Sequence, residues 1–417
     1  MRHIAIIGAG QAGLILAHSL LREGYTVDIY SDRTADQWLN ESRPTGTAYL
    51  HGETISHERA LGIDRWYDVM FKGHGALVHI ADPAGGAPLV VTGKTELPGA
   101  AVDQRLKFHH WMNEFEKRGG RTFIESVTPE RLDDISAGVD LTIIAAGKAA
   151  LSNIIPRDDA RSYFSKPPRR LAMAVVRNIT DGWQDAIGFA PVKFNFIPGA
   201  GEFFWVPYYH KTAGKTWSGI LEAIPGGPMD IFGNCKSGEE VVEGLRHIVN
   251  TFAPWDIDIC KNMEYVSEDP YGWLTGQFAP TVRTGFGTLP SGRLVMPVGD
   301  TAITFDPIGG QGGNCATRNA LFTARKIIER KDQPFDAAWM AAINDEFWNT
   351  DAKFAYQFNN MMLEPPTPAT MILMQTAAQN RRFADEVWVR NMVEPKRFYP
   401  WILDAEATNQ KVREFLA

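Results

Sequence analysis

The chain has 417 residues, enough for two hydrophobic cores, and its 44% hydrophobic and 22% charged residues are ordinary for a globular protein. A formal net charge of −7 argues against nucleic acid or an anionic membrane as a partner. The three cysteines (Cys235, Cys260, Cys315) are too scattered for a disulfide framework or a zinc site. No apolar run approaches the roughly 20 residues of a membrane span. Met1 leads directly into the first predicted strand, which leaves no signal peptide. We therefore expect a cytoplasmic protein without a metal.

The N-terminus carries the strongest motif. Residues 4–7 form a β-branched run, Gly8-Ala9-Gly10-Gln11-Ala12-Gly13 follows, and residues 14–22 have apolar side chains at helical spacing. In GxGxxG between strand and helix, Gly8 permits the tight turn and Gly10 lets the backbone approach a pyrophosphate. Gly13 lets the helix pack close to the strand. The motif predicts a dinucleotide site, with an ordinary strand–helix turn as the alternative.

Residues 26–30 read as the second parallel strand. An acid that binds the ribose is expected about 20 residues after the glycines, at the tip of this strand. The tip is Ser31, followed by Asp32 and Arg33. A serine hydroxyl can still bond a ribose, with Asp32 or Arg33 assisting. The displaced carboxylate weakens the case for NAD more than the case for a nucleotide.

Residues 34–100 lack a long helical period and are rich in Gly, Pro, Thr and His. We interpret them as an insertion whose loops carry substrate contacts. A helix follows over residues 103–118, with Arg105 in its first turn. Contact with a nucleotide phosphate and an ordinary helical arginine are equally consistent with that position.

The remaining elements indicate a two-domain α/β protein. Residues 140–145 form a strand that returns beside the first one, and residues 294–298 form the last strand. Between them, residues 171–176, 194–196, 203–206 and 217–223 read as strands without crossover helices, which predicts an antiparallel sheet. We expect a discontinuous Rossmann-type FAD-binding domain, an inserted antiparallel-sheet substrate domain and C-terminal helices. Their boundaries are 1–160 with 285–330 (34–100 contributing loops to the substrate site), 161–284 and 331–417.

A second glycine-rich segment closes the predicted parallel sheet. Gly299-Asp300 follows the last strand, and Asp306-Pro307-Ile308-Gly309-Gly310-Gln311-Gly312-Gly313-Asn314 precedes a helix to about residue 330. With the N-terminal motif, this is similar to FAD enzymes of the para-hydroxybenzoate hydroxylase type. That resemblance implies that the first loop binds the pyrophosphate and Asp300 the ribityl chain. The helix starting near Asn314 would direct its positive dipole at the flavin, favouring the anionic reduced form.

Much of the chain resembles a narrower family, the styrene and indole monooxygenases. The residues that carry this resemblance run from end to end: Tyr30-Ser31-Asp32-Arg33, Ala101-Val102-Asp103-Gln104-Arg105-Leu106, Arg118-Gly119-Gly120, Ala146-Gly147-Lys148-Ala149-Ala150-Leu151, Lys166-Pro167-Pro168-Arg169, Gly299-Asp300 to Asn314, Pro365-Pro366 and Ala384-Asp385-Glu386. The resemblance implies that a separate NAD(P)H-dependent flavin reductase supplies reduced FAD, which with O2 forms a C4a-peroxide. One oxygen then passes to a small aromatic alkene, an indole or a sulfide.

The resemblance also implies a set of site residues. The cofactor residues would be Gly8, Gly10, Gln11, Ala12, Gly13, Ser31, Asp32, Arg33, Arg43, Arg105, Ala146, Gly147, Gly299, Asp300, Pro307, Gly310, Gly312, Gly313 and Asn314. His74, Pro307 and Gly310 match the family and would act in catalysis, although a structural histidine is an equal interpretation of His74. The pocket would be lined by Gly46, Ala48, Leu50, Phe71 and Gly99. The styrene enzymes carry Asn, Tyr and Ser where Gly46, Phe71 and Gly99 stand, so we expect a roomier, less polar pocket.

Alternatives remain open at this point. Single-component hydroxylases of this fold carry Asp-Gly after the strand that corresponds to residues 140–145, whereas this chain has Ala146-Gly147. Direct use of NAD(P)H and a flavin-binding protein without oxygenase turnover are the two alternatives to the reductase-dependent oxygenase. Residues 202–207 fail to match the two-tryptophan motif of flavin-dependent halogenases, which disfavours halogenation. The sequence leaves a homodimer open.

Overall fold

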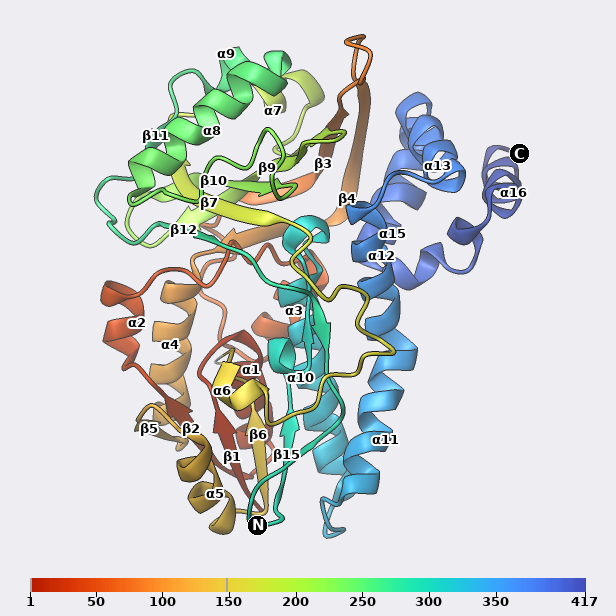
Figure 1. Ribbon diagram of the computed structural model, residues 1–417. Coiled ribbons are helices and arrows are strands. Elements are labelled where there is room, and N and C mark those ends of the chain that lie inside the picture. The colour runs from red at the N-terminus through yellow and green to blue at the C-terminus, as the bar shows by residue number, and fades with distance from the viewer. Residues whose placement is uncertain (1, 148) are drawn as a thin grey trace.

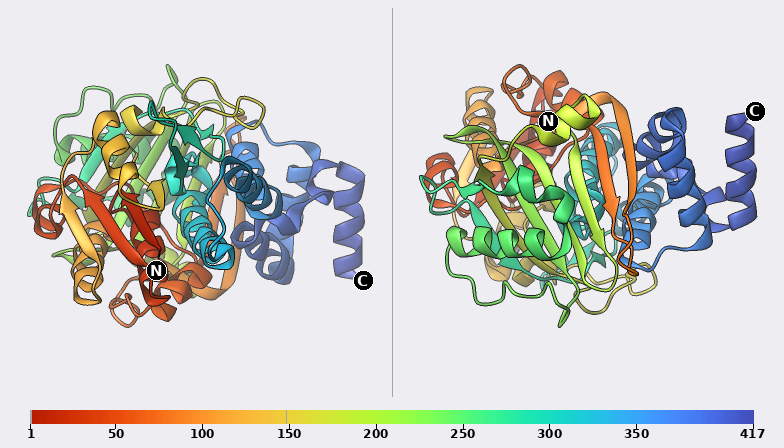
Figure 2. Two further views of the ribbon diagram at one scale, coloured as in Figure 1. Left: turned by 90° about the horizontal axis from the view of Figure 1, so that it is seen from below. Right: turned by 90° about the horizontal axis from the view of Figure 1, so that it is seen from above.

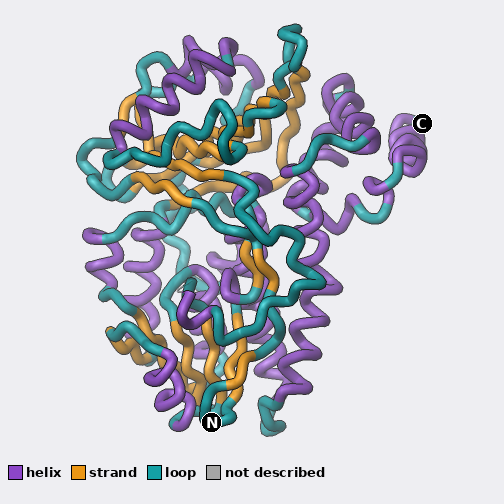
Figure 3. Tube along the Cα trace, viewed as in Figure 1, coloured by secondary structure: helices purple, strands orange, loops and turns teal. Residues whose placement is uncertain are grey.

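The computed structural model describes residues 2–147 and 149–417, so Met1 and Lys148 of the motifs above lie outside the described residues. Figure 1 shows a lower domain built on one sheet and an upper sheet covered by a long helix. A column of helices runs up one side of both. Figure 3 shows the same division, with orange strands in two separate layers and purple helices around them. The two layers meet near the middle of the molecule, which is where the site is built.

The lower domain contains a six-stranded, mostly parallel sheet. Its order is β14 (Gly287–Thr288), β15 (Leu294–Pro297), β6 (Leu141–Ile144), β1 (His3–Ile7), β2 (Thr26–Ser31) and β5 (Arg121–Ile124). Strand β6 pairs in parallel with β1, beside which the sequence placed it. Alternate β1 side chains face opposite layers, because a strand has a period of two. Ile4 and Ile6 pack with the helices α1 (Gln11–Arg22), α4 (Gln104–Lys117) and α10 (Gln311–Arg330). Ala5 and Ile7 pack with α5 (Pro129–Ala137) and α6 (Ala149–Ser152).

The upper domain contains an eight-stranded mixed sheet. Its path is β11 (Glu264–Tyr265), β7 (Arg170–Arg177), β10 (Gly214–Ala223), β9 (Gly201–His210), β4 (Leu89–Val102), β3 (Lys72–Ile80) and β8 (Val192–Ile197), and β12 (Trp273–Gly276) pairs with β7. One face packs under α8 (Gly238–Phe252), and on the other face Phe204 of β9 packs in one cluster with Ile308, which precedes α10. Strand β9 is buried on both faces, and an almost unbroken apolar run is typical of that position.

The interpretation of residues 34–100 as loops is wrong in part. The segment contains α2, α3 and the long strands β3 and β4, and these strands pair with each other and with β8 and β9 of the upper sheet. The sequence signal was weak because Gly73, Gly75, Gly93 and Gly99 interrupt both strands. Glycine lowers strand propensity. In these strands the absence of a side chain allows close contacts with Tyr49, β4 and Trp388.

The helices complete both domains and form the C-terminal column. They are α1 (Gln11–Arg22), α2 (Ala35–Glu41), α3 (Gly52–Ala60), α4 (Gln104–Lys117), α5 (Pro129–Ala137), α6 (Ala149–Ser152), α7 (Gly182–Ile187), α8 (Gly238–Phe252), α9 (Ile257–Cys260), α10 (Gln311–Arg330), α11 (Ala337–Phe347), α12 (Lys353–Leu363), α13 (Pro368–Gln379), α14 (Arg381–Phe383), α15 (Arg390–Val393) and α16 (Ala405–Leu416). Figure 2 shows α16 standing away from the body of the molecule in both views. Within the described residues, none of these helices has the length and apolar character to cross a membrane.

The start of α1 packs against the sheet without side chains between them. A Cβ at Gly13 would lie 2.0 Å from the Gly8 carbonyl oxygen, and a Cβ at Gly8 would lie 2.6 Å from the Ala145 carbonyl oxygen. Gly8 also has φ +121°, which disfavours any L side chain. By contrast, no described atom lies within 4 Å of a Cβ placed at Gly10. Gly8 and Gly13 are therefore glycines for packing reasons, whereas Gly10 faces open space.

This difference predicts opposite results for two alanine substitutions. We expect Gly13→Ala to lower the free energy of unfolding by about 2 kcal/mol or more, because the added methyl group overpacks a rigid helix–strand contact. Gly10→Ala, three residues earlier, should change it by less than about 1 kcal/mol. Chemical denaturation of both variants measures the difference. Equal losses would contradict the packing role of Gly13.

Candidate functional site

Four chain segments meet at the carboxyl ends of the parallel strands. The Gly8 amide donates to the Tyr30 carbonyl at 2.8 Å, and the Ala145 amide donates to the Ile7 carbonyl at 2.8 Å. The Thr301 hydroxyl donates to the Ala146 carbonyl at 3.0 Å. Strand ends of an open parallel sheet form a crevice where ligands bind. The residues after β1, β2, β6 and β15 thus lie together at one edge of the sheet.

The Gly299-Asp300 segment lies directly against the first glycine loop. A Cβ at Gly299 would lie 2.6 Å from the Ala12 Cβ, and Gly299 has φ +66°. The Gly299 amide donates to the Asn319 side chain of α10 at 2.9 Å. Ala146 is half-buried and Gly147 exposed beside them. The two glycine motifs, nearly 300 residues apart in sequence, therefore form a single structure.

Gln11 ties this structure to neighbouring helices. Its buried amide donates to Glu58 at 2.8 Å and to the Thr317 hydroxyl at 3.0 Å. These bonds join the start of α1 to α3 and α10. The Gln11 side chain is therefore a brace between helices, and only its backbone is left to face the crevice.

The residues that follow β2 have different structural roles. The Ser31 hydroxyl donates to the Arg33 carbonyl at 2.7 Å and accepts from the Arg33 amide, so it stabilises the turn. Asp32 is exposed at the tip of the strand. Arg43, which the sequence placed in the cofactor site, donates to the Trp273 carbonyl at 2.8 Å and stacks on the Trp273 ring. Its guanidinium thus joins the 43–51 segment to the upper sheet.

Arg105 is fully buried in an ion-pair network. Its guanidinium contacts Asp103 at 2.7 Å and Asp269 at 2.6 Å, and it also donates to the Ser42 carbonyl. Its side chain has no exposed surface. Of the two interpretations of Arg105, the buried network therefore supports a structural role, and we do not include Arg105 in the proposed cofactor site.

Asp300 lies at the carboxyl edge of the parallel sheet with a perturbed acidity. The residue is exposed to solvent, and desolvation by neighbouring protein atoms raises the pKa of its carboxyl to about 6. A carboxylate at this edge can accept hydrogen bonds from ligand hydroxyls.

Asn314 anchors the start of α10. Its side-chain amide donates to the carbonyls of Tyr49 and Gly310, and its oxygen accepts from the His51 amide and the Thr54 hydroxyl. All four bonds are 2.7–3.0 Å long, and Asn314 is buried. The Asn314 side chain therefore holds the 49–54 segment against α10 and is not free for a ligand.

The other predicted residues near α10 form its glycine-rich approach. Pro307 begins a short 3-10 helix (Pro307–Gly309), and Gly310 has φ +61° with no described atom within 4 Å of a Cβ. Gly312 is also open, since a Cβ there would lie 3.8 Å from Phe305. The free amides at the start of the 20-residue helix α10 point into this open region.

Two of the predicted pocket residues, Ala48 and Leu50, lie beside this helix start. A Cβ at Gly313 would lie 3.2 Å from Leu50 Cδ2 and 3.9 Å from the Ala48 Cβ. No described atom lies within 4 Å of the Cβ position of Gly46, which precedes them in the chain. Ala48 and Leu50 therefore pack against the start of α10.

Gly99 has a different role from the one expected. Gly99 of β4 pairs with Gly73 of β3, and the Tyr49 ring covers this pair of glycines. A Cβ at Gly99 would lie 2.5 Å from both the Tyr49 hydroxyl and the Leu50 carbonyl oxygen. Tyr49 thus fills the space that the missing side chain leaves. Tyr49 was not among the site residues expected from the sequence, although its position between the expected pocket residues Ala48 and Leu50 indicated it.

His74 and Phe71 are not placed together. His74 is half-buried on β3, and burial followed by the charges of Lys94 and Lys72 lowers its pKa, so it is neutral at pH 7. Phe71 packs edge-on against Trp217, in the core beneath α8. Tyr49 and Ile308 pack on the opposite face of that sheet. We therefore leave Phe71 out of the proposed pocket.

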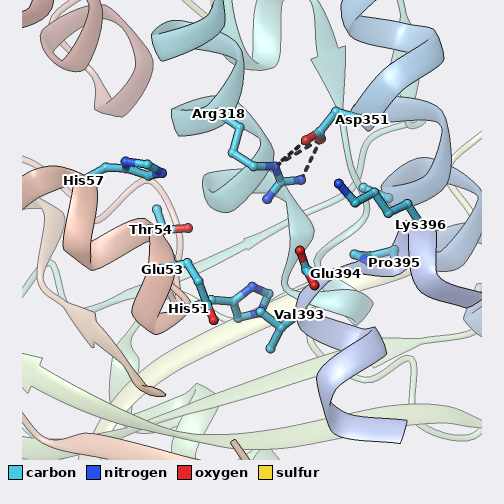
Figure 4. A pocket seen from close by; sticks show the side chains of 11 residues that line it. His51, Glu53, Thr54, His57, Arg318, Asp351, Val393, Glu394, Pro395 and Lys396 are labelled. Atoms are coloured by element: carbon cyan, nitrogen blue, oxygen red, sulfur yellow. Dashed lines mark hydrogen bonds and ion pairs between the residues drawn. The ribbon is translucent and has the colours of Figure 1, made fainter. Parts of the chain in front are cut away.

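A cavity of about 170 Å³ lies on the side of α10 that faces α3 and α12. Figure 4 shows Arg318 paired with Asp351, and His51, Glu394 and Lys396 are among the other side chains that line the cavity. Arg318 binds Asp351 through two nitrogens at 2.9–3.0 Å. Burial, with Arg318 nearby, lowers the pKa of His51 to about 3. The sequence analysis missed this group. Arg318 lies one helical turn after Asn314 and therefore on the same face of the predicted helix, which was the sequence feature that could have indicated it.

Comparisons with known proteins agree with this geometry. A family profile described as "Styrene monooxygenase A putative substrate binding domain" matches residues 147–258. Styrene monooxygenase StyA of Pseudomonas fluorescens is 26% identical, covering 99% of this chain and 98% of the relative. StyA of a second Pseudomonas is 25% identical, with the same coverage. Over nearly its whole length, the chain is therefore similar to styrene monooxygenase StyA.

The solved structures support the fold independently. A flavin-dependent brominase, Bmp2, superposes with a TM-score of 0.70 over 99% of both chains at 16% identity. At that identity the likeness concerns the fold alone. It agrees with the Rossmann-type α/β class expected from the sequence.

The raised pKa of Asp300 predicts how flavin binding depends on pH. If its carboxylate accepts hydrogen bonds from the ligand, binding favours the ionised form, so affinity falls as pH drops through the flavin-free pKa of about 6. Between pH 7 and pH 5 we expect about a tenfold loss of FAD affinity. Asp300→Asn should bind more weakly at pH 7 and show no such dependence. Fluorescence titration measures both.

Gly10→Val serves as the companion variant. Its side chain would enter the space that we assign to the pyrophosphate, so FAD affinity should be lost at every pH in a folded protein. Unchanged affinity in Gly10→Val, or an Asp300→Asn variant that keeps the wild-type pH dependence, would contradict these assignments.

Proposed function

We propose that the chain is the oxygenase component of a two-component monooxygenase that uses reduced FAD and O2 to oxygenate a small apolar aromatic substrate. The observation that carries the proposal is the joined pair of glycine motifs. Gly8, Gly13 and Gly299 are packed without room for a side chain, whereas Gly10 and Gly310 face open space. Such backbone surfaces at the starts of α1 and α10 suit a ligand with a pyrophosphate and a flat ring system.

We propose FAD rather than a smaller flavin because the first glycine loop, the Gly299-Asp300 segment and α10 contact one another, so that one extended ligand would reach all three. Gly10 would receive the pyrophosphate and Asp300 the ribityl hydroxyls. The α10 amides would stabilise negative charge on the ring system. Bound reduced FAD would supply the reaction with oxygen, and the substrate needs no side-chain nucleophile.

The chain's own contribution is to position the substrate and exclude water. Ala48 and Leu50 cover the start of α10 with apolar atoms, and Asn314 fixes their segment through the Tyr49 carbonyl. A dry, rigid wall beside the flavin protects the oxygenating species from water. His74 of β3, half-buried and with a lowered pKa, stays our proposed hydrogen-bonding residue for the substrate. The substrate class that we infer is an alkene, indole or sulfide of the kind that styrene monooxygenases accept.

The source of electrons tests the proposal against a single-component hydroxylase. Ala146 places a methyl group where direct NAD(P)H users of this fold are expected to carry a carboxylate. We predict that the purified protein with FAD does not oxidise NADH or NADPH appreciably, with or without an aromatic substrate. Adding a generic flavin reductase should start substrate oxygenation, measured by product analysis. NADH oxidation at about one per second without a reductase would contradict the proposal.

Gly46 tests the location of the pocket. No described atom would meet its new side chain, so Gly46→Leu should fill free space. We expect it to suppress turnover of bulky aromatic substrates more than that of small ones. Gly99→Ala is the control, because its methyl group would press on Tyr49 and reduce turnover equally across a size series. A uniform loss in Gly46→Leu, with unchanged FAD affinity, would place Gly46 outside the pocket.

A further inference from the structure

A buried group of three carboxyls and one arginine lies where the two domains meet. Glu202 of β9 and Glu222 of β10 are directly opposite each other in the upper sheet. Asp306 approaches from the lower domain, immediately before Pro307. Arg169 pairs with Glu202 at 2.5 Å. At most 8% of the surface of any of these four residues is exposed. Three ionised carboxylates beside one guanidinium would leave a net charge of −2 without water, which is strongly unfavourable.

Glu222 is the member of the group that has no cationic partner. Its two carboxyl oxygens accept no N–H or O–H donor from the described part of the chain. The group that its carboxyl faces is the carboxyl of Asp306. Burial, then Asp306 and Glu202, raise the pKa of Glu222 well above its usual value, and Arg169 opposes this only weakly. Two facing carboxyls in a dry site share one proton, as in a carboxylic acid dyad.

Asp306 carries the loop that leads to α10. Its carboxyl accepts from the Ile308 amide at 3.2 Å, which caps the 3-10 helix Pro307–Gly309. Asn359 of α12 holds the same turn through the Asp306 carbonyl and the Gly309 amide, at 2.9 and 3.0 Å. The loop is thus held on one side by α12 and on the other by Glu222 of the upper sheet.

We propose that Glu222 donates a retained proton to the Asp306 carboxylate and thereby docks the 306–310 loop, which faces the flavin site, onto the substrate sheet. Glu222 is then a positioning residue, since it acts on the flavin site through Asp306. Its role at that site rests on the proposed function, whereas the shared proton does not.

The shared proton has a definite effect on stability. The unfolded chain releases the Glu222 proton near pH 4.3, while the folded chain keeps it to higher pH. Folding therefore carries a stabilising contribution that is complete below pH 4.3 and is lost as pH rises toward the folded pKa. The amide of Glu222→Gln donates the same hydrogen bond without a titrating proton. The melting temperature of Glu222→Gln should therefore increase relative to that of the wild type as pH rises.

The test uses the full chain without flavin, by thermal unfolding between pH 5 and pH 9. The difference in melting temperature, Glu222→Gln minus wild type, should rise by about 2 °C or more over this range. Glu264→Gln, the same change at an exposed position on β11, should give a difference that does not vary with pH. A constant difference for Glu222→Gln would overturn the shared proton.

A second measurement tests positioning. We expect Glu222→Gln to keep FAD affinity within about twofold at pH 7. Glu222→Leu removes the hydrogen bond and leaves Asp306 charged, so its FAD affinity should fall about tenfold. Unchanged affinity in Glu222→Leu would overturn the docking role. If none of these proteins, the wild type included, binds FAD, the proposed function fails, but the thermal result still decides the shared proton.

Discussion

Backbone contact at the start of α1 is the constraint on which the rest of the structure depends. Gly13 lies on the Gly8 backbone and Gly8 on the Ala145 backbone, and Gly299 lies on the methyl group of Ala12. These contacts bring the ends of β1, β6 and β15 within reach of one ligand. They also aim the free amides of α1 into the crevice. A functional site therefore follows from close packing, because only glycine permits backbones to approach this far.

A single buried side chain sets the second half of the site. Asn314 uses both its polar atoms to hold the 49–54 segment on α10. The bond from Thr54 is fully buried and the other three are partly buried, so loss of the Thr54 bond would leave a buried polar group unpaired at a cost of about 1–3 kcal/mol. Ala48 keeps a positive φ of 48° under this restraint. The wall that Ala48 and Leu50 form beside α10 is consequently rigid.

The two domains are coupled more closely than the order of the chain suggests. Strands β3 and β4 leave the first domain early and supply part of the upper sheet, which residues 170–276 then complete. After the last parallel strand the chain contacts that sheet again at Asp306, which lies beside Glu222. The loop before α10 therefore touches both domains. Its carboxyl contact with Glu222 makes the geometry of the flavin region depend on a proton held between them.

The sequence by itself determined the parallel domain, because GxGxxG, the apolar strands and Gly299-Asp300 are local patterns with strong periodicity. It also placed α10 and the resemblance to flavin monooxygenases. Only the tertiary structure decided what Asn314, Arg105 and Phe71 do, since each side chain contacts partners distant in sequence. The same holds for Gly99, whose role depends on Tyr49, and for β3 and β4, whose glycines hid their pairing. Residue type and spacing reveal an element, but which groups fill a buried site follows from long-range packing.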